Sequence, residues 1–207
     1  TQEIAVFSPD AEGTWPVVFT FHGSTNTWED MEEVSTRIAQ QGMVVFSPTY
    51  RSEPPFAIAD SEQDAECAYR FGRTIASDYG GDIHRPVTFV GHSLGATVAI
   101  EHGLQEAAFV PGGTYDTCFT GAPRPDVIVG ITGCYYRNGF NVQRYENPDA
   151  KLVCLDIAPY ANTPAHDRPD VLNVGGFSDV TFELIADFAR DRLGPDLWAG
   201  EIAKVKL

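Results

Sequence analysis

The chain is poor in lysine and has no long apolar run. Lys occurs only at 151, 204 and 206, and 29 acidic residues against 14 basic ones give a net charge of −15. Nucleic acid and anionic membrane surfaces would repel such a chain, so we expect neither as a partner. No apolar stretch approaches the length of a membrane span. No signal peptide begins at Thr1, although a mature or trimmed chain would also lack one.

Motifs for metals and nucleotide cofactors are missing as well. The sequence has no metal-ligand cluster, no P-loop and no GxGxxG fingerprint, so we expect no cofactor. Its four cysteines include no CxxC pair and no zinc-finger spacing. A secreted setting, slightly favoured here, would permit disulfides, and Cys118 with Cys134 is the preferred bridge because both lie in loop-like surroundings. Four buried free thiols are the alternative.

The pattern of the 207 residues predicts one α/β domain. Apolar runs typical of strands alternate with segments in which apolar residues recur at helical spacing. This alternation predicts βαβ units, and therefore a mostly parallel central sheet with helices on both faces. Residues 136–169 are irregular and are interpreted as a cap or loop insertion. The predicted strands are 4–7, 16–21, 43–46, 87–90, 126–132, 171–176 and 201–207; the predicted helices begin near 28, 61, 96 and 182.

The stretch 86–96, PVTFVGHSLGA, places a G-x-S-x-G pattern between a predicted strand and a predicted helix. This strand–turn–helix context is what a nucleophile elbow requires, so Ser93 is the candidate nucleophile. The turn strains the serine backbone, and small residues are needed two positions to either side; Gly91 and Gly95 meet that need. A Gly-rich turn whose serine only caps the helix is the alternative.

These features together resemble the α/β-hydrolase superfamily, and within it carboxylesterase, feruloyl-esterase and dienelactone-hydrolase-like members. The resemblance is carried by FHGST, SPTYRSEPPF, YGGDIHRPVTFVGHSLGA and VLNVGGFSD. It implies a three-layer α/β-hydrolase fold and a serine hydrolase that cleaves carboxylic esters through a Ser93 acyl-enzyme. The oxyanion would be held by the backbone N–H of Leu94 and by that of Gly23 or Ser24. A peptidase or an acyltransferase would use the same motifs.

The resemblance also implies an acid that follows a later strand. In VLNVGGFSD this acid is Asp179, which would orient the catalytic imidazole; a cap for the following helix is the alternative. A second register would make residues 151–157 the acid-bearing strand. It would place the acid near Tyr160 and the base near Ser178, so we prefer the first register.

The sequence does not supply an obvious catalytic base. In the preferred register the histidine follows the strand EIAKVKL, and the sequence stops at Leu207. His22 is predicted to brace its loop, and His92 to pack toward the sheet interior. His84 and His166 precede strands at the opposite edge, although the long loop around His166 gives it freedom to reach in, and His102 points away on the helix.

Two hypotheses follow from this missing base. The chain is either a serine carboxylesterase whose His-bearing segment is absent from the sequence given, or a catalytically impaired hydrolase-like protein that binds a ligand or partner. Substrate identity is not encoded in a readable motif. Four aromatic residues are candidates for lining the pocket, or for the core: Trp28, Tyr50, Phe56 and Tyr135.

Overall fold

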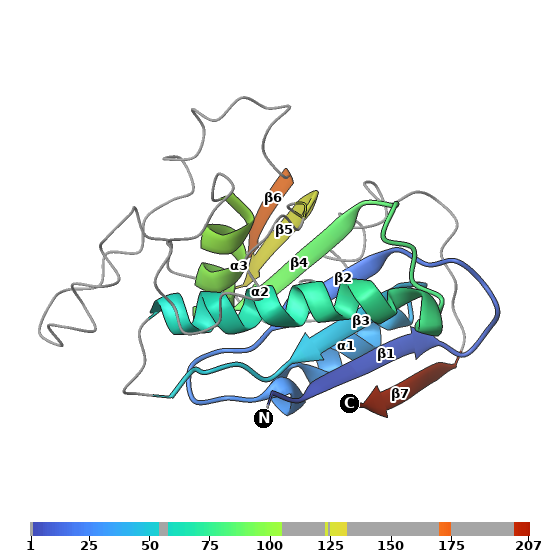
Figure 1. Ribbon diagram of the computed structural model, residues 1–207, viewed down its shortest axis with the longest axis horizontal. Coiled ribbons are helices and arrows are strands. Elements are labelled where there is room, and N and C mark those ends of the chain that lie inside the picture. The colour runs from blue at the N-terminus through green and yellow to red at the C-terminus, as the bar shows by residue number, and fades with distance from the viewer. Residues whose placement is uncertain (1, 54–57, 105–122, 124, 132–169, 175–200) are drawn as a thin grey trace, which may run out of the picture.

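The computed structural model describes residues 2–53, 58–104, 123, 125–131, 170–174 and 201–207. Within this part of the chain, seven strands form one sheet in the order β6-β5-β4-β2-β3-β1-β7 (Figure 1). Strands β2 to β6 run parallel, whereas β1 is antiparallel to both of its neighbours. The strands are β1 Ile4–Pro9, β2 Val17–Phe21, β3 Val44–Pro48, β4 Val87–His92, β5 Val127–Ile131, β6 Asp170–Val174 and β7 Ile202–Lys206.

Helices cover both faces of this sheet. On one face, α1 (Glu32–Ala39) contributes Val34 and Ile38 to a core that includes Val18 of β2. On the other face, α2 (Ile58–Ile75) and α3 (Leu94–Leu104) pack against Phe19 and its neighbours. Alternate residues of β2 therefore enter two different cores, as the pleat of a strand requires. The predicted three-layer α/β fold is confirmed.

Phe19 is the centre of the core beneath α2. Its ring stacks on Phe46 at a centroid distance of 5.2 Å and meets the Tyr69 ring edge-on at 5.0 Å. A Cβ at Gly72 would lie 2.6 Å from the Phe19 ring, so α2 can approach the sheet only because that residue has no side chain. This contact fixes the helix that follows β3.

Strand β7 is present where the sequence predicts it, and it forms the edge of the sheet beside β1. It pairs antiparallel with β1, with Val6 opposite Val205, and Ile4 and Leu207 exchange two backbone hydrogen bonds of 3.2 and 2.9 Å. Strand β6 forms the other edge, beside β5. An alternating strand that buries little of its surface can pair with either edge, and its sequence does not say which.

Several predictions fall on residues outside the described part of the chain. They are the irregular insertion at 136–169, the helix near 182, and the bridge between Cys118 and Cys134. Cys67, on α2, is disulfide-bonded, so it is not one of four free thiols. None of the described helices is long and apolar enough to cross a membrane.

Candidate active site

Ser93 occupies the sharp turn between β4 and α3. Its φ of 53° lies in the left-handed region, which residues other than glycine rarely adopt. The Ser93 N–H donates to the carbonyl of Ile131 at the end of β5 (2.9 Å), and the Ser93 carbonyl accepts from the N–H of Ala96 (3.1 Å). These bonds hold the strained backbone at the carboxyl edge of the parallel strands, where ligands bind in sheets of this kind.

The turn brings three backbones together with no room for side chains. A Cβ at Gly91 would lie 2.1 Å from the carbonyl oxygen of Gly95, and a Cβ at Gly95 would lie 2.1 Å from that of Phe21. Both distances are far inside van der Waals contact, and the opposing atoms are backbone. The predicted need for glycine at these two positions is confirmed.

The loop that follows β2 lies beside Ser93. A Cβ at Gly23 would be 3.4 Å from the Ser93 Cβ, an ordinary contact distance. Thr25 has a φ of 61°, and its N–H donates to the carbonyl of Ser52 (3.1 Å), so that amide is already engaged. Of the amides in this stretch, those of Gly23 and Ser24 are the ones left as candidate oxyanion donors.

Leu94 supplies the other candidate donor. It is the first residue of α3, and the N–H of a first helical residue has no intrahelical acceptor. The N-terminal end of a helix also favours negative charge. The structure thus places Ser93, Leu94 and Gly23 together, with Ser24 next along the loop.

His22 is fully buried and braces this loop. Its Nδ1 lies 2.8 Å from the carbonyl oxygen of Gly23, and its Nε2 lies 3.3 Å from the backbone nitrogen of Tyr50. Because a carbonyl can only accept and an N–H can only donate, Nδ1 carries the proton and Nε2 is the acceptor. Burial lowers the pKa of His22, which keeps the imidazole neutral. The predicted bracing role is confirmed, and both ring nitrogens are occupied.

Tyr50 completes this buried unit. Its ring stacks on the imidazole of His22 at a centroid distance of 4.1 Å, and its hydroxyl donates to the His22 carbonyl. Tyr50 and Trp28 are buried, so both belong to the core and neither is an exposed platform for a substrate. Phe56 and Tyr135 lie outside the described residues.

Arg51 clamps the loop after β3 to the start of α2. Its Nε and Nη2 donate to the two carboxylate oxygens of Asp64 (2.8 and 2.9 Å), and its Nη1 donates to Asp60 (2.9 Å). The carbonyl of Arg51 accepts from the Ser61 hydroxyl (2.6 Å). Sequence analysis did not identify this clamp. Its signal is a pair of carboxylates four residues apart on one helical face, shortly after an arginine.

His92 is half-buried, and its Nδ1 would be 3.5 Å from a Cβ at Gly23. Burial lowers its pKa, an effect that the charge of Asp30 opposes. The ring was predicted to pack toward the sheet interior; the structure places it beside Gly23 in the loop after β2.

The position predicted for the catalytic histidine, the loop after β7, starts far from Ser93 in the sheet. Strand β7 is four strands away from β4, so a loop that leaves β7 begins about 19 Å from the elbow at the usual strand spacing. His84 is exposed and precedes β4, at the opposite edge of the sheet, as predicted. Asp179, His166 and the side chain of His102 lie outside what the structure describes. No group of acidic, His or Cys side chains in the described residues could hold a metal ion.

Comparison with known proteins identifies a matching family model and solved structures with a similar fold. The BD-FAE family model matches residues 5–117, more than half of the chain, and this stretch includes the whole Ser93 turn and the loop after β2. No curated protein sequence matches.

The fold is shared with solved esterase structures. Native esterase 2 of Thermogutta terrifontis superposes with a TM-score of 0.66 at 16% identity, over 94% of this chain and 90% of that one. Its propionate-bound form gives a TM-score of 0.67 at 16% identity, over 94% and 92%. A bifunctional GH43-CE protein of Bacteroides eggerthii gives 0.64 at 17% identity, over 92% of this chain and 36% of that one. With an α/β-hydrolase fold and a family match over most of its described residues, this chain belongs to the BD-FAE family.

Proposed function

We propose that this chain is a serine hydrolase that cleaves carboxylic esters. The proposal rests above all on one observation: Ser93 is held at a left-handed φ between β4 and α3, beside the Gly23 loop and the first amide of the helix. A non-glycine residue in this region costs about 1–3 kcal/mol, a strain that folds retain mainly at functional sites. Membership of the BD-FAE family supports the same function.

In this mechanism, the Ser93 hydroxyl oxygen attacks the ester carbonyl carbon while a base takes the hydroxyl proton. The resulting oxyanion accepts hydrogen bonds from the Leu94 N–H and from the N–H of Gly23 or Ser24. Collapse of this intermediate breaks the bond to the alcohol oxygen, which leaves with the proton. Water then attacks the acyl-enzyme, and the carboxylate product and free Ser93 are released.

The proposed acid is Asp179, which would orient a histidine that acts as the base. His22 does not fill that role, because both of its ring nitrogens are bonded, and His84 lies at the other edge of the sheet. Asp179 lies outside the described residues, and we propose that the base lies there too or beyond the sequence given.

Related structures suggest suitable probes. Esterase 2 of T. terrifontis is recorded in a propionate-bound form and phosphonylated by sarin. Organophosphorus reagents modify activated serines, so a fluorophosphonate probe tests Ser93 in this chain directly.

The test combines fluorophosphonate labelling with hydrolysis of p-nitrophenyl acetate. We expect the protein to be labelled once and to hydrolyse the ester, and Ser93→Ala to abolish labelling and lower kcat by roughly 10⁶-fold. Ser77→Ala, an exposed serine at the opposite edge, is the matched control and keeps full activity. Equal activity in Ser93→Ala and the parent would contradict the proposal.

A hydrolase-like binding protein without a catalytic base is the second candidate. It is favoured by the place of β7, which removes the predicted histidine position from the neighbourhood of Ser93. A folded protein that contains all residues C-terminal to Leu207 in its native gene, and that is neither labelled nor active, would select this candidate. Hydrolysis of amides, or acyl transfer to alcohols in place of water, would instead indicate a peptidase or an acyltransferase.

A further inference from the structure

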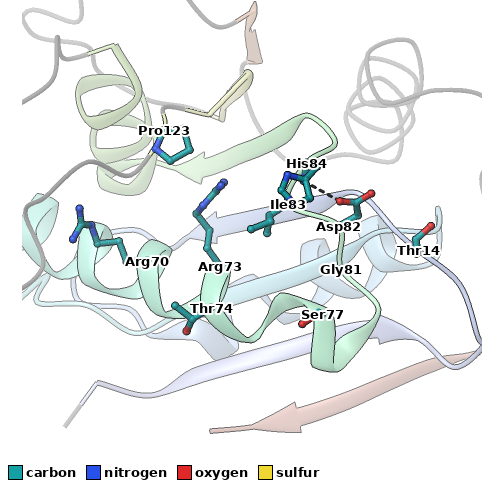
Figure 2. Close-up of a pocket in the computed structure, with 10 residues that line it drawn as sticks. All are labelled: Thr14, Arg70, Arg73, Thr74, Ser77, Gly81, Asp82, Ile83, His84 and Pro123. Carbon is teal, nitrogen blue, oxygen red and sulfur yellow. Dashed lines mark hydrogen bonds between the residues drawn. The ribbon is translucent and has the colours of Figure 1, made fainter.

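A cavity of about 890 Å³ lies at the opposite edge of the sheet from Ser93 (Figure 2). It is formed by the C-terminal part of α2, the 3-10 turn η2 (Ala76–Tyr79), and the loops that precede β2, β4 and β5. Its size is within the range of small-molecule sites. Because these loops enter the strands at their amino ends, the cavity is separate from the elbow.

The cavity gathers positive charge in a strongly acidic protein. Arg70, Arg73 and His84 line it, and Asp82 is the one carboxylate among its described lining residues. The Asp82 carboxylate accepts from the backbone N–H of His84 (2.9 Å), so it is engaged by its own loop. Arg70 is paired with Glu66 (2.7 Å), so Arg73 is the guanidinium of this wall that no described carboxylate pairs with, in a chain that carries −15 overall.

The guanidinium of Arg73 is held in place before any ligand arrives. Its Nη1 donates to the Tyr69 hydroxyl (3.2 Å), and its central carbon lies 5.4 Å from the centroid of the Tyr69 ring. The Tyr69 hydroxyl in turn donates to the carbonyl of Pro123 (2.7 Å), and burial raises its pKa to about 12, so it keeps its proton. No carboxylate within the described residues forms an ion pair with Arg73. One of its five N–H donors is engaged by Tyr69.

Arg70, one turn before Arg73 on α2, also has a guanidinium donor without a described partner. Its Nε donates to Glu66 (2.7 Å), and its Nη2 is buried with no hydrogen-bond acceptor among the residues that the structure describes. A buried donor without an acceptor costs about 1–3 kcal/mol. Figure 2 shows the Arg73 side chain rising from α2 between Pro123 and Ile83, and the Arg70 side chain on the same helix pointing away from Arg73.

We propose that this cavity binds a small organic carboxylate. The fork of N–H groups on Arg73 matches the two oxygens of a carboxylate, and Arg70 lines the same cavity. Ile83 and Pro123 provide apolar surface for the body of the ligand. Inorganic phosphate shares the oxyanion chemistry but has no apolar body, so it binds more weakly.

The experiment is calorimetric titration of benzoate, and separately of inorganic phosphate, into the folded protein at low salt. We expect saturable binding of benzoate, weaker binding of phosphate, and a loss of affinity for both on addition of salt. Arg73→Gln lowers the affinity for benzoate by about tenfold or more, because a charge-assisted bidentate contact is lost. Ser77→Asp, which adds a negative charge at the cavity wall four residues after Arg73, also weakens binding.

Two control variants separate this cavity from the elbow. Ser93→Ala and Arg37→Gln, the latter an arginine of α1 paired with Glu33, keep the affinity of the parent protein. Circular dichroism checks that each variant is folded, and Ser77→Asp decides the matter if Arg73→Gln is not. The proposal is overturned if benzoate does not saturate the protein, if Arg73→Gln and Ser77→Asp bind it unchanged, if Ser93→Ala abolishes binding, or if phosphate binds as tightly as benzoate. The outcome is independent of whether Ser93 reacts.

Discussion

The two ends of the parallel strands carry candidate sites made from different parts of the chain. At the carboxyl edge, the groups that surround Ser93 are backbone amides, and their positions depend on Gly91 and Gly95 fitting against other backbone. At the amino edge, the cavity is lined by long side chains of α2, and Arg73 is positioned by Tyr69. A site made of backbone is placed by the same contacts that hold the sheet together. A substitution that disrupts such a site therefore also destabilises the fold. A site made of side chains can instead lose a charged group by substitution while the fold stays intact.

Gly95→Ala tests this coupling most severely. The added Cβ would meet the Phe21 carbonyl oxygen at 2.1 Å, and backbone cannot rotate away as a side chain can. We expect a loss of at least about 3 kcal/mol in the free energy of unfolding, or no folded protein at all. Urea denaturation followed by circular dichroism measures this loss.

The matched control is Gly23→Ala, where the new Cβ would have ordinary contacts of 3.4 Å or more. This variant keeps its stability within about 0.5 kcal/mol. Similar stability of the two variants would show that backbone contact at Gly95 does not couple the carboxyl-edge site to the fold.

A change of pH tests how much one buried side chain of the carboxyl edge, His22, contributes to stability. Burial lowers the pKa of His22 in the folded protein, so this group contributes stability above its unfolded pKa of about 6.5. As the pH falls below that value, the unfolded chain binds the proton first and the contribution is lost. We expect the free energy of unfolding to fall between pH 7.5 and pH 5, and to fall less steeply in His22→Phe than in the parent.

The parent protein, titrated in the same buffers, is the control for this pH effect. His22→Phe also removes the acceptor for the Tyr50 N–H, at a cost of about 1–3 kcal/mol at neutral pH. A parent-like slope in His22→Phe would mean that the buried imidazole does not contribute to the pH dependence.

Arg51→Lys is expected to have the smallest effect. A lysine cannot reproduce the paired bonds to Asp64 together with the bond to Asp60. Because the arginine side chain is 42% exposed, we expect a loss of only about 1 kcal/mol. Arg37→Lys, in an exposed pair on α1, should cost less than Arg51→Lys in the same urea titration. A larger cost at Arg37 would contradict the interpretation of Arg51 as a clamp.

The parts of the site that lie close in sequence could be predicted, and those that depend on distant partners could not. The turn around Ser93 was predictable because strand, glycines and helix occupy one short stretch. The tautomer of His22 depends on Tyr50, and the pose of Arg73 depends on Tyr69 and on Pro123, which lies 54 residues beyond that tyrosine. No local pattern marks such pairs.

By itself, the sequence determined the strands of the parallel sheet, the helices between them and the need for glycine on either side of Ser93, because buried runs and backbone crowding leave local signatures. Only the tertiary structure decided that β7 forms the edge of the sheet beside β1, at the opposite end from β6. An alternating strand fits either edge equally well, so its sequence does not make this choice. The same holds for the arginine-lined cavity at the amino edge. Its walls come from segments that are far apart in the chain and meet only when the sheet is assembled.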